Sequence, residues 1–248
     1  MRAMILAAGL GTRLRPLTDD RPKALVKLGG RTMLEITLAR LREFGVGEVI
    51  VNVHHFAGMV VEYLQAHGNF GMRVEVSREG ELLDTGGGLK QAAWFFLAGD
   101  QAEEPFFLHN VDVISKIDLA KMVEFHRAQG ALATLAVQDR ETSRYLLWDG
   151  QGQLCGRRLG RDGTVEMARE GGTVKALAFS GIHVISPQLL REMREEGAFS
   201  IIDTYQRLAG RGEKICGFPA DGYYWRDVGR AESVREVEQD LRQGVLRT

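Results

Sequence analysis

Short apolar runs alternate with amphipathic stretches along the first 139 residues, and this alternation limits the fold more than any other feature of the chain. The predicted buried strands are residues 2–8, 48–53, 72–76, 106–108 and 131–137. The predicted helices between them are residues 32–44, 57–67, 87–97 and 118–130. Strands that alternate with helices indicate a mostly parallel sheet with helices on both faces, so the sequence predicts an α/β fold.

The alternation ends after residue 140, where strands separated by glycine-rich turns predominate. The predicted strands in this part are residues 145–148, 153–158, 174–185, 214–218 and 223–228. Residues 200–210 and 231–243 are predicted helices, and Ser200 with Asp203 is expected to form a partial capping box at the start of the first one. The simplest arrangement is a single domain over residues 1–248, in which the second half extends the sheet of the first.

Composition narrows the classes of partner and compartment. The chain of 248 residues carries 32 Lys and Arg against 33 Asp and Glu, so no excess of positive charge is available for nucleic acid or an anionic membrane. There is no apolar run of about 20 residues that would span a bilayer, and Met4–Ala8 is too short for a signal segment. We therefore expect a cytoplasmic protein in which Cys155 and Cys216, far apart in the chain, are reduced thiols.

A glycine-rich loop follows the first predicted strand. It reads Leu6-Ala-Ala-Gly-Leu-Gly-Thr-Arg-Leu-Arg-Pro-Leu-Thr18 and is followed by Pro22-Lys23. Gly9 and Gly11 permit a close backbone approach to an anion, and Arg13 and Arg15 carry forks suited to phosphate oxygens. Leu14 stands where a dinucleotide-binding fingerprint needs glycine, and no Walker A sequence is present. An ordinary turn with solvated arginines is the alternative interpretation.

Two acidic residues stand at unusual places in predicted strands. Asp112 ends the apolar segment Phe106-Phe-Leu-His-Asn-Val-Asp112, which places it at the carboxyl edge of the sheet, where open α/β folds bind ligands. Asp227 lies in the aromatic segment Tyr223-Tyr-Trp-Arg-Asp227-Val-Gly229. An acid in such a strand is costly unless it is paired or holds a cation. Arg226 is a poor partner because adjacent strand residues face opposite sides, so a cation or another basic group is expected.

The segment Gly-x-Gly-Thr-Arg-Leu-x-Pro-Leu-Thr, followed by Pro-Lys four residues later, resembles the opening motif of the sugar-1-phosphate nucleotidyltransferases. The order of elements resembles that family over essentially the whole chain. The resemblance implies a Rossmann-like three-layer sandwich of the glycosyltransferase-A-like type, with a nucleotide-binding half (1–139) and a sugar-phosphate-binding half (140–248). It also implies Mg²⁺-dependent transfer of NMP from a nucleoside triphosphate to a sugar 1-phosphate, with release of pyrophosphate. The N-acetylmuramate-1-phosphate uridylyltransferase and mannose-1-phosphate guanylyltransferase branches are the most similar.

The resemblance implies roles for particular residues. The implied catalytic residues are Arg13, Lys23, Asp112 and Asp227, of which Asp112 and Asp227 are the implied Mg²⁺ ligands. The implied nucleotide-binding residues are Leu6, Ala8, Gly9, Gly11, Thr12, Arg13, Glu79, Thr85, Gly86 and Gly87. The implied sugar-phosphate-binding residues are Lys23, Asn110, Lys175, Ser180, Gly181 and Asp203. The glycines of residues 86–88 are expected to leave backbone N–H groups at the start of a helix free for the base.

The chain departs from the family pattern in two places. Val111 stands where the family has glycine before the first acid, and we expect it to narrow the approach to the sugar or to shift the strand end. The family's Glu-Lys-Pro motif for the sugar phosphate is absent, and Lys175 is the candidate substitute. Two other functions remain open: a nucleotide- or sugar-sensing module without turnover, and a nicotinamide-dependent oxidoreductase, which Leu14 disfavours.

Overall fold

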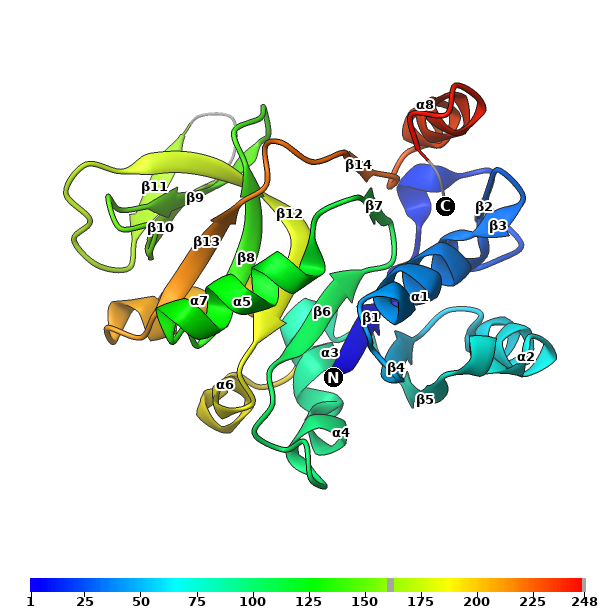
Figure 1. The fold of residues 1–248 in the computed structure, drawn as a ribbon, viewed down its shortest axis with the longest axis horizontal. Coiled ribbons are helices and arrows are strands. Elements are labelled where there is room, and N and C mark those ends of the chain that lie inside the picture. Colours follow the sequence, from blue (N-terminus) through cyan, green and yellow to red (C-terminus); the bar gives the residue numbers. More distant parts are fainter. Residues whose placement is uncertain (160–162, 247–248) are drawn as a thin grey trace.

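A computed structural model describes residues 1–159 and 163–246. Its largest element is a ten-stranded sheet in the order β11-β10-β9-β12-β6-β1-β4-β5, with β8 beside β12 and β13 beside β8 (Figure 1). Four neighbouring strands of the first half are β1 (Arg2–Leu6), β4 (Glu48–Val53), β5 (Arg73–Arg78) and β6 (Phe106–Asn110), and they pair with one another in parallel. The predicted α/β fold with parallel central strands is therefore confirmed.

The later strands extend the same sheet, mainly with antiparallel pairings. They are β8 (Ala133–Gln138), β9 (Arg144–Trp148), β10 (Leu154–Leu159), β11 (Thr164–Met167), β12 (Lys175–Ile185) and β13 (Ile215–Pro219). The long strand β12 joins the two halves because it pairs with β6 and β8 of the first half and with β9 of the second. Two small ribbons stand apart from the sheet, β2 (Lys27–Leu28) with β3 (Arg31–Thr32) and β7 (Val113–Ser115) with β14 (Trp225–Asp227).

The helices divide between the two faces of the sheet. They are α1 (Met33–Glu43), α2 (Ala57–Ala66), α3 (Asp84–Gln91), α4 (Ala93–Leu97), α5 (Leu119–Gln129), α6 (Gln188–Glu192), α7 (Ile201–Gly210) and α8 (Ala231–Arg242), with the 3-10 turns Thr12–Leu14, Lys23–Leu25 and Gly68–Gly71. Figure 1 shows α1 and α5 on the near side of the sheet.

The apolar core has two parts, one on each face of the sheet, and the side chains of β1 contribute to them alternately. Successive residues of a strand face opposite sides, and Ala3 and Ile5 enter one apolar cluster while Met4 and Leu6 enter the other. The first cluster contains the buried faces of α1, α2, α5 and α8, and the second contains those of α3, α4 and α7. The sheet is thus covered on both faces, so the residues available to bind a ligand lie in the loops at the strand ends.

Three local predictions need correction. The helix predicted over 87–97 is two helices, because the chain breaks at Ala92 and α3 already begins at Asp84. Ser200 caps α7 through Ile202 N, but the Asp203 carboxylate binds Arg157 instead of completing a capping box. The strand predicted over 223–228 is only three residues long and leaves the main sheet to pair with β7.

Two further predictions, on the cysteines and on membrane-spanning segments, can be compared with the structure. Cys155 and Cys216 are both buried free thiols, as expected. Within residues 1–159 and 163–246, none of the helices has the length and apolar character needed to cross a membrane.

Candidate active site

The ribbon of β7 and β14 brings together two acids that are far apart in the chain. Asp227 pairs with Val113 in this antiparallel ribbon, so it lies beside the residue that follows Asp112. The backbone closes the arrangement, because Val228 N donates to the carbonyl oxygen of Asp112 at 2.8 Å. The Asp227 carboxylate is fixed in turn by the backbone N–H of Gly229, also at 2.8 Å.

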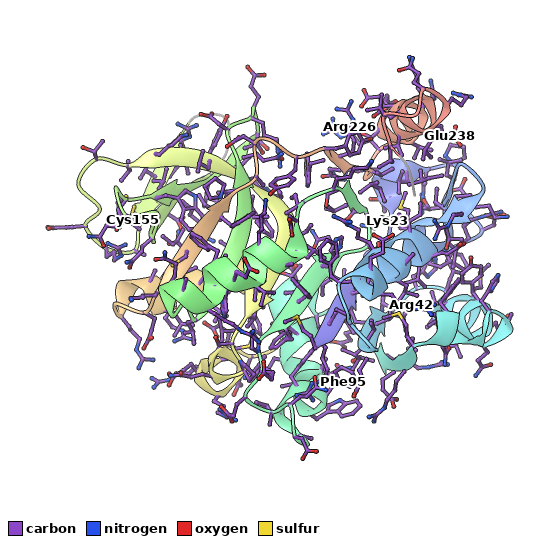
Figure 2. The ribbon with its side chains drawn as sticks, in the orientation of Figure 1. Lys23, Arg42, Phe95, Cys155, Arg226 and Glu238 are labelled. Atoms are coloured by element: carbon purple, nitrogen blue, oxygen red, sulfur yellow. The ribbon has the colours of Figure 1, made fainter. Side chains whose placement is uncertain are left out.

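Four charged side chains converge at this point. Lys23 Nζ donates to Asp112 Oδ2 at 2.7 Å, and the two side chains are only 15% and 11% exposed (Lys23 is labelled in Figure 2). The position that a Cβ on Gly229 would occupy lies 2.8 Å from Asp227 Oδ1, 3.1 Å from Arg13 Nη2 and 3.5 Å from Asp112 Oδ2. The distance between Asp227 Oδ1 and Asp112 Oδ2 therefore cannot exceed the distances of 2.8 and 3.5 Å taken together. Arg13, Lys23, Asp112 and Asp227 form one cluster, which we call the charged centre.

The charged centre has the donor set of a divalent-cation site. Ligand oxygens on one Mg²⁺ lie about 3–4 Å apart. This spacing is within the upper limit on the distance between the Asp112 and Asp227 oxygens. Lys23 already places one cation on Asp112, which shows that positive charge fits beside this oxygen. Among the described residues, no group of three or more His, Cys, Asp or Glu side chains could hold a metal. Two carboxylates with phosphate oxygens and water completing the shell is the arrangement that Mg²⁺ commonly adopts.

The glycine-rich loop lies against the charged centre. Gly11 has φ +66°, and its carbonyl oxygen accepts from Thr18 Oγ1 at 2.8 Å, which folds the loop back on itself. Leu14 is fully buried and anchors the turn, whereas Thr12 and Arg13 are exposed. A Cβ on Gly9 would lie 3.7 Å from Lys23 Nζ. Gly9 and Gly11 of the predicted loop thus lie next to Lys23, whereas Leu6 and Ala8 are buried at and just after the end of β1.

A second buried network supports the start of the predicted base-recognition segment. Glu79 is only 5% exposed, and its carboxylate accepts from Asn52 Nδ2 at 2.7 Å and from Leu83 N at 3.0 Å. Asn52 Oδ1 in turn accepts from Ala7 N at 2.7 Å. A Cβ on Gly88 would lie 2.6 Å from Glu79 Oε1, so only glycine fits there. Glu79 therefore connects the end of β1 to the loop before α3.

The backbone N–H groups of residues 86 and 87 are not free, contrary to the sequence prediction. Gly86 N and Gly87 N both donate to the carbonyl oxygen of Phe199, at 2.9 and 3.4 Å. The Thr85 hydroxyl accepts from Ile201 N at 3.0 Å. A Cβ on Gly86 would lie 2.3 Å from the Phe199 ring. These glycines allow α3 to pack tightly against the segment before α7. This packing is sufficient reason for glycine at both positions, and no bound base is needed to explain it.

The predicted sugar-contacting segment of β12 also meets the site. Gly181 has φ +76°, and a Cβ there would lie 2.6 Å from Val113 and 3.1 Å from Asn110 Nδ2. The structure thus brings Gly181 and Asn110 together next to the ribbon that carries Asp227. Ser180 is fully buried, and its hydroxyl donates to Gln138 while its carbonyl oxygen accepts from Trp225 Nε1 at 2.7 Å.

Two predicted sugar-phosphate residues lie in other contacts. Lys175 is exposed and pairs with Asp139 at 3.3 Å, and Asp203 pairs with Arg157 at 2.6 Å. Val111 is completely buried in the core and donates its N–H to Leu6. Its side chain therefore does not narrow the site, and the expectation that it would do so is wrong.

Arg140 is a residue of the site that the sequence analysis missed. It lines a cleft of about 1080 Å³ together with Arg13, Trp225 and Asp227. Burial lowers the pKa of its guanidinium, and the negative charge of Asp227 acts in the opposite direction. It belongs to no motif and lies in the loop between β8 and β9, so no pattern in the sequence distinguished it.

A family model described as "Nucleotidyl transferase" matches residues 2–244 of this chain. The chain belongs to the nucleotidyl transferase family. This membership confirms the predicted enzyme class, and it favours nucleotidyl transfer over the sensing-module and oxidoreductase alternatives.

Several relatives of this chain are named as enzymes that act on sugar 1-phosphates. The N-acetylmuramate alpha-1-phosphate uridylyltransferase of Caulobacter vibrioides is 34% identical over 252 residues, which cover 96% of each chain. A mannose-1-phosphate guanyltransferase of Yarrowia lipolytica is 31% identical over 93% of this chain, which spans only 61% of that relative's length. The crystal structure of a UDP-glucose pyrophosphorylase complexed with UDP-glucose shares the fold, with a TM-score of 0.75 at 14% identity over 98% of both chains.

Proposed function

We propose that this protein transfers UMP from UTP to N-acetylmuramate 1-phosphate and releases pyrophosphate. The observation that carries the reaction class is the charged centre, in which two acids from distant segments meet one lysine and one arginine beside a glycine-rich loop. The choice of base and sugar rests on the Caulobacter uridylyltransferase, which matches over nearly its whole length. The guanyltransferase relative extends well beyond this chain and makes transfer of GMP to mannose 1-phosphate the second candidate.

The proposed reaction needs no general base, because the attacking phosphate of the sugar is already an anion. What the protein must do is hold two polyanions in line and offset the charge that develops on the leaving pyrophosphate. Lys23 would bind the α-phosphate or the sugar phosphate, and the exposed fork of Arg13 would bind the pyrophosphate oxygens. Both cations lie within the charged centre, so they would act on the same triphosphate.

We propose Asp112 and Asp227 as the residues that hold Mg²⁺. When bound, the ion would neutralise charge on the phosphate oxygens. Lys23 now holds Asp112 Oδ2, so this proposal requires Lys23 to leave that oxygen and become available to a substrate phosphate. Backbone contacts position both residues, because Gly229 N holds the Asp227 carboxylate and Val228 N binds the main-chain carbonyl oxygen of Asp112.

Pyrophosphate release tests the proposal directly. The purified chain is assayed with UTP, dTTP, GTP, CTP and ATP, each against N-acetylmuramate 1-phosphate, mannose 1-phosphate, glucose 1-phosphate and N-acetylglucosamine 1-phosphate. We expect the highest kcat/KM with UTP and N-acetylmuramate 1-phosphate. No release with any pair would refute the reaction class, and a preference for GTP with mannose 1-phosphate would select the second candidate.

The Asp227→Asn variant tests the metal assignment. It keeps the size of the side chain but removes the charge, and we expect turnover to fall on the order of 10²–10³-fold, as for the loss of one transition-state contact. The exposed Asp100 provides a matched control, since Asp100→Asn removes the same charge elsewhere on the surface. Near-normal turnover of Asp227→Asn would show that Asp227 is not a metal ligand.

A further inference from the structure

Arg140 is fixed in place by two neighbours that come from other parts of the chain. Its guanidinium carbon lies 3.9 Å from the centre of the Trp225 ring, and Nη2 donates to the carbonyl oxygen of Phe179 at 2.8 Å. Trp225 is itself held by the bond from its Nε1 to Ser180. Arginine stacked on an aromatic ring and bonded at one nitrogen has little freedom left to lose on binding a ligand.

This positioned cation lacks an anionic partner. Arg157, another half-buried arginine, is by contrast neutralised by Asp203 and Glu166 at 2.6 and 2.8 Å. Across residues 1–159 and 163–246, no carboxylate lies within ion-pair distance of Arg140, and its Nε is buried without a hydrogen-bond partner. A half-buried guanidinium without a paired carboxylate is costly in the free protein, and an oxyanion bound on the open side of Arg140 would offset that cost.

The location of Arg140 favours the sugar substrate over the nucleotide. Its two protein contacts are Phe179 and Trp225, which adjoin the segment of β12 that carries Ser180 and Gly181. On its open side it lines the cleft that also contains Asp227. It therefore lies between the charged centre and β12. Lys175, the cation predicted for this task from the sequence, is instead exposed and paired with Asp139.

We propose that Arg140 binds an oxyanion of the sugar 1-phosphate and thereby replaces the missing Glu-Lys-Pro lysine. This inference rests on the proposed function. N-acetylmuramate 1-phosphate offers two such groups, the phosphate and the carboxylate of its lactyl ether, and a guanidinium fork suits either one. Arg140 is accordingly a positioning residue for the acceptor. Binding to the lactyl carboxylate would also make Arg140 a residue that determines specificity for N-acetylmuramate 1-phosphate.

The test compares two acceptors that differ only in the lactyl group, N-acetylmuramate 1-phosphate and N-acetylglucosamine 1-phosphate. In Arg140→Gln, we expect KM for N-acetylmuramate 1-phosphate to rise on the order of 10- to 100-fold, the effect of one charge-assisted contact, with KM for UTP unchanged. An equal rise for both acceptors assigns the phosphate, and a rise for N-acetylmuramate 1-phosphate alone assigns the carboxylate. An acceptor that is not turned over is measured as a competitive inhibitor.

Two further variants separate binding from structure. Arg140→Lys retains the charge, so it should recover part of the affinity for the acceptor that Arg140→Gln loses. Arg211→Gln is the matched control, because Arg211 pairs with Glu192 at 3.1 Å and does not line the cleft that contains Arg140. We expect this control to retain the wild-type KM. Thermal unfolding of each variant verifies that the protein is folded.

The inference is overturned by either of two results in a wild-type enzyme that releases pyrophosphate. One is an unchanged KM for both acceptors in Arg140→Gln. The other is a rise confined to KM for UTP, or to KM for pyrophosphate in the reverse reaction, which would assign Arg140 to the triphosphate. Absence of pyrophosphate release from the wild-type protein would refute the proposed function instead, so the two failures are distinguishable.

Discussion

Lys23 and Asp112 neutralise each other at the floor of the charged centre, with most of both side chains out of contact with water. Removing two charges from water is expensive, and their attraction offsets that cost only in good geometry. Lys23 and Asp112 therefore hold each other in position. Lys23 can exchange Asp112 for a substrate phosphate, and Asp112 can exchange Lys23 for a metal ion. A hydrophobic pair of similar size would pack equally well but would provide no ligand.

Gly229 is the residue at which the smallest change should have the largest effect on the charged centre. A Cβ there would lie 2.8 Å from Asp227 Oδ1 and 3.1 Å from Arg13 Nη2, so both side chains would have to shift to make room for it. We expect Gly229→Ala to fold normally and to lose turnover on the order of 10²-fold, the effect of misplacing groups by about 1 Å.

Steady-state kinetics and a thermal unfolding scan test the Gly229→Ala prediction. Gly222→Ala is the control, because residue 222 lies in the same segment and a Cβ there meets nothing within 4 Å. Wild-type turnover in Gly229→Ala would mean that the positions of Asp227 and Arg13 do not limit the reaction.

At the scale of elements, the ribbon of β7 and β14 is the device that completes the site. It takes one strand from each half of the chain and sets Asp227 beside Val113 through backbone pairing alone. The order of the side chains along each strand then decides what faces the cleft, because alternate residues point to opposite sides. In the turn that precedes β7, Val111 enters the core and Asp112 joins the charged centre.

Helix α5 contributes a pH-dependent term to stability through His126. Its ring nitrogens bond to Thr134 of β8 and to Ser186, each at 3.0 Å, and burial lowers the pKa to about 4 from the ordinary 6.5. As the pH falls below 6.5 the unfolded chain takes up a proton that the folded chain refuses. The stabilisation is therefore complete above pH 6.5 and is lost as the pH falls toward 4.

Urea unfolding at pH 7 and pH 5 measures this term. The wild-type free energy of unfolding should fall over this interval, with about 1–2 kcal/mol of the loss due to His126. The His126→Gln variant has a lower stability at pH 7 but should lose less on acidification. Equal losses in both proteins would contradict the lowered pKa of His126. The buried His109 and His183, with pKa values lowered by burial to about 4 and about 3, add to the loss in both proteins alike.

At the scale of the whole molecule, the sequence was informative where local patterns decide structure. The strands and helices of the first half follow from hydrophobic periodicity, and the residues of the charged centre each lie in a motif. Three features escaped because they depend on tertiary contacts. The helix predicted over 87–97 starts early, at Asp84, where Gly86 packs against Phe199. Strand β14 leaves the sheet for β7, and Arg140 is placed by Trp225, 85 positions along the chain.

Because the charged centre takes Lys23 and Asp112 from the first half and Asp227 from the second, a ligand bound there should stabilise the molecule as a unit. At about 100 times its Kd, a ligand that binds only the folded state adds about 2.7 kcal/mol to the free energy of unfolding, or roughly 5–10 °C in Tm for a chain of this size. We expect UTP with Mg²⁺ to produce such a shift in the wild-type protein, and to shift far-UV circular dichroism and tryptophan fluorescence transitions together. Asp112→Asn should abolish most of it. A shift of equal size in that variant, or one seen by a single probe, would mean that the nucleotide binds away from the charged centre or within one half alone.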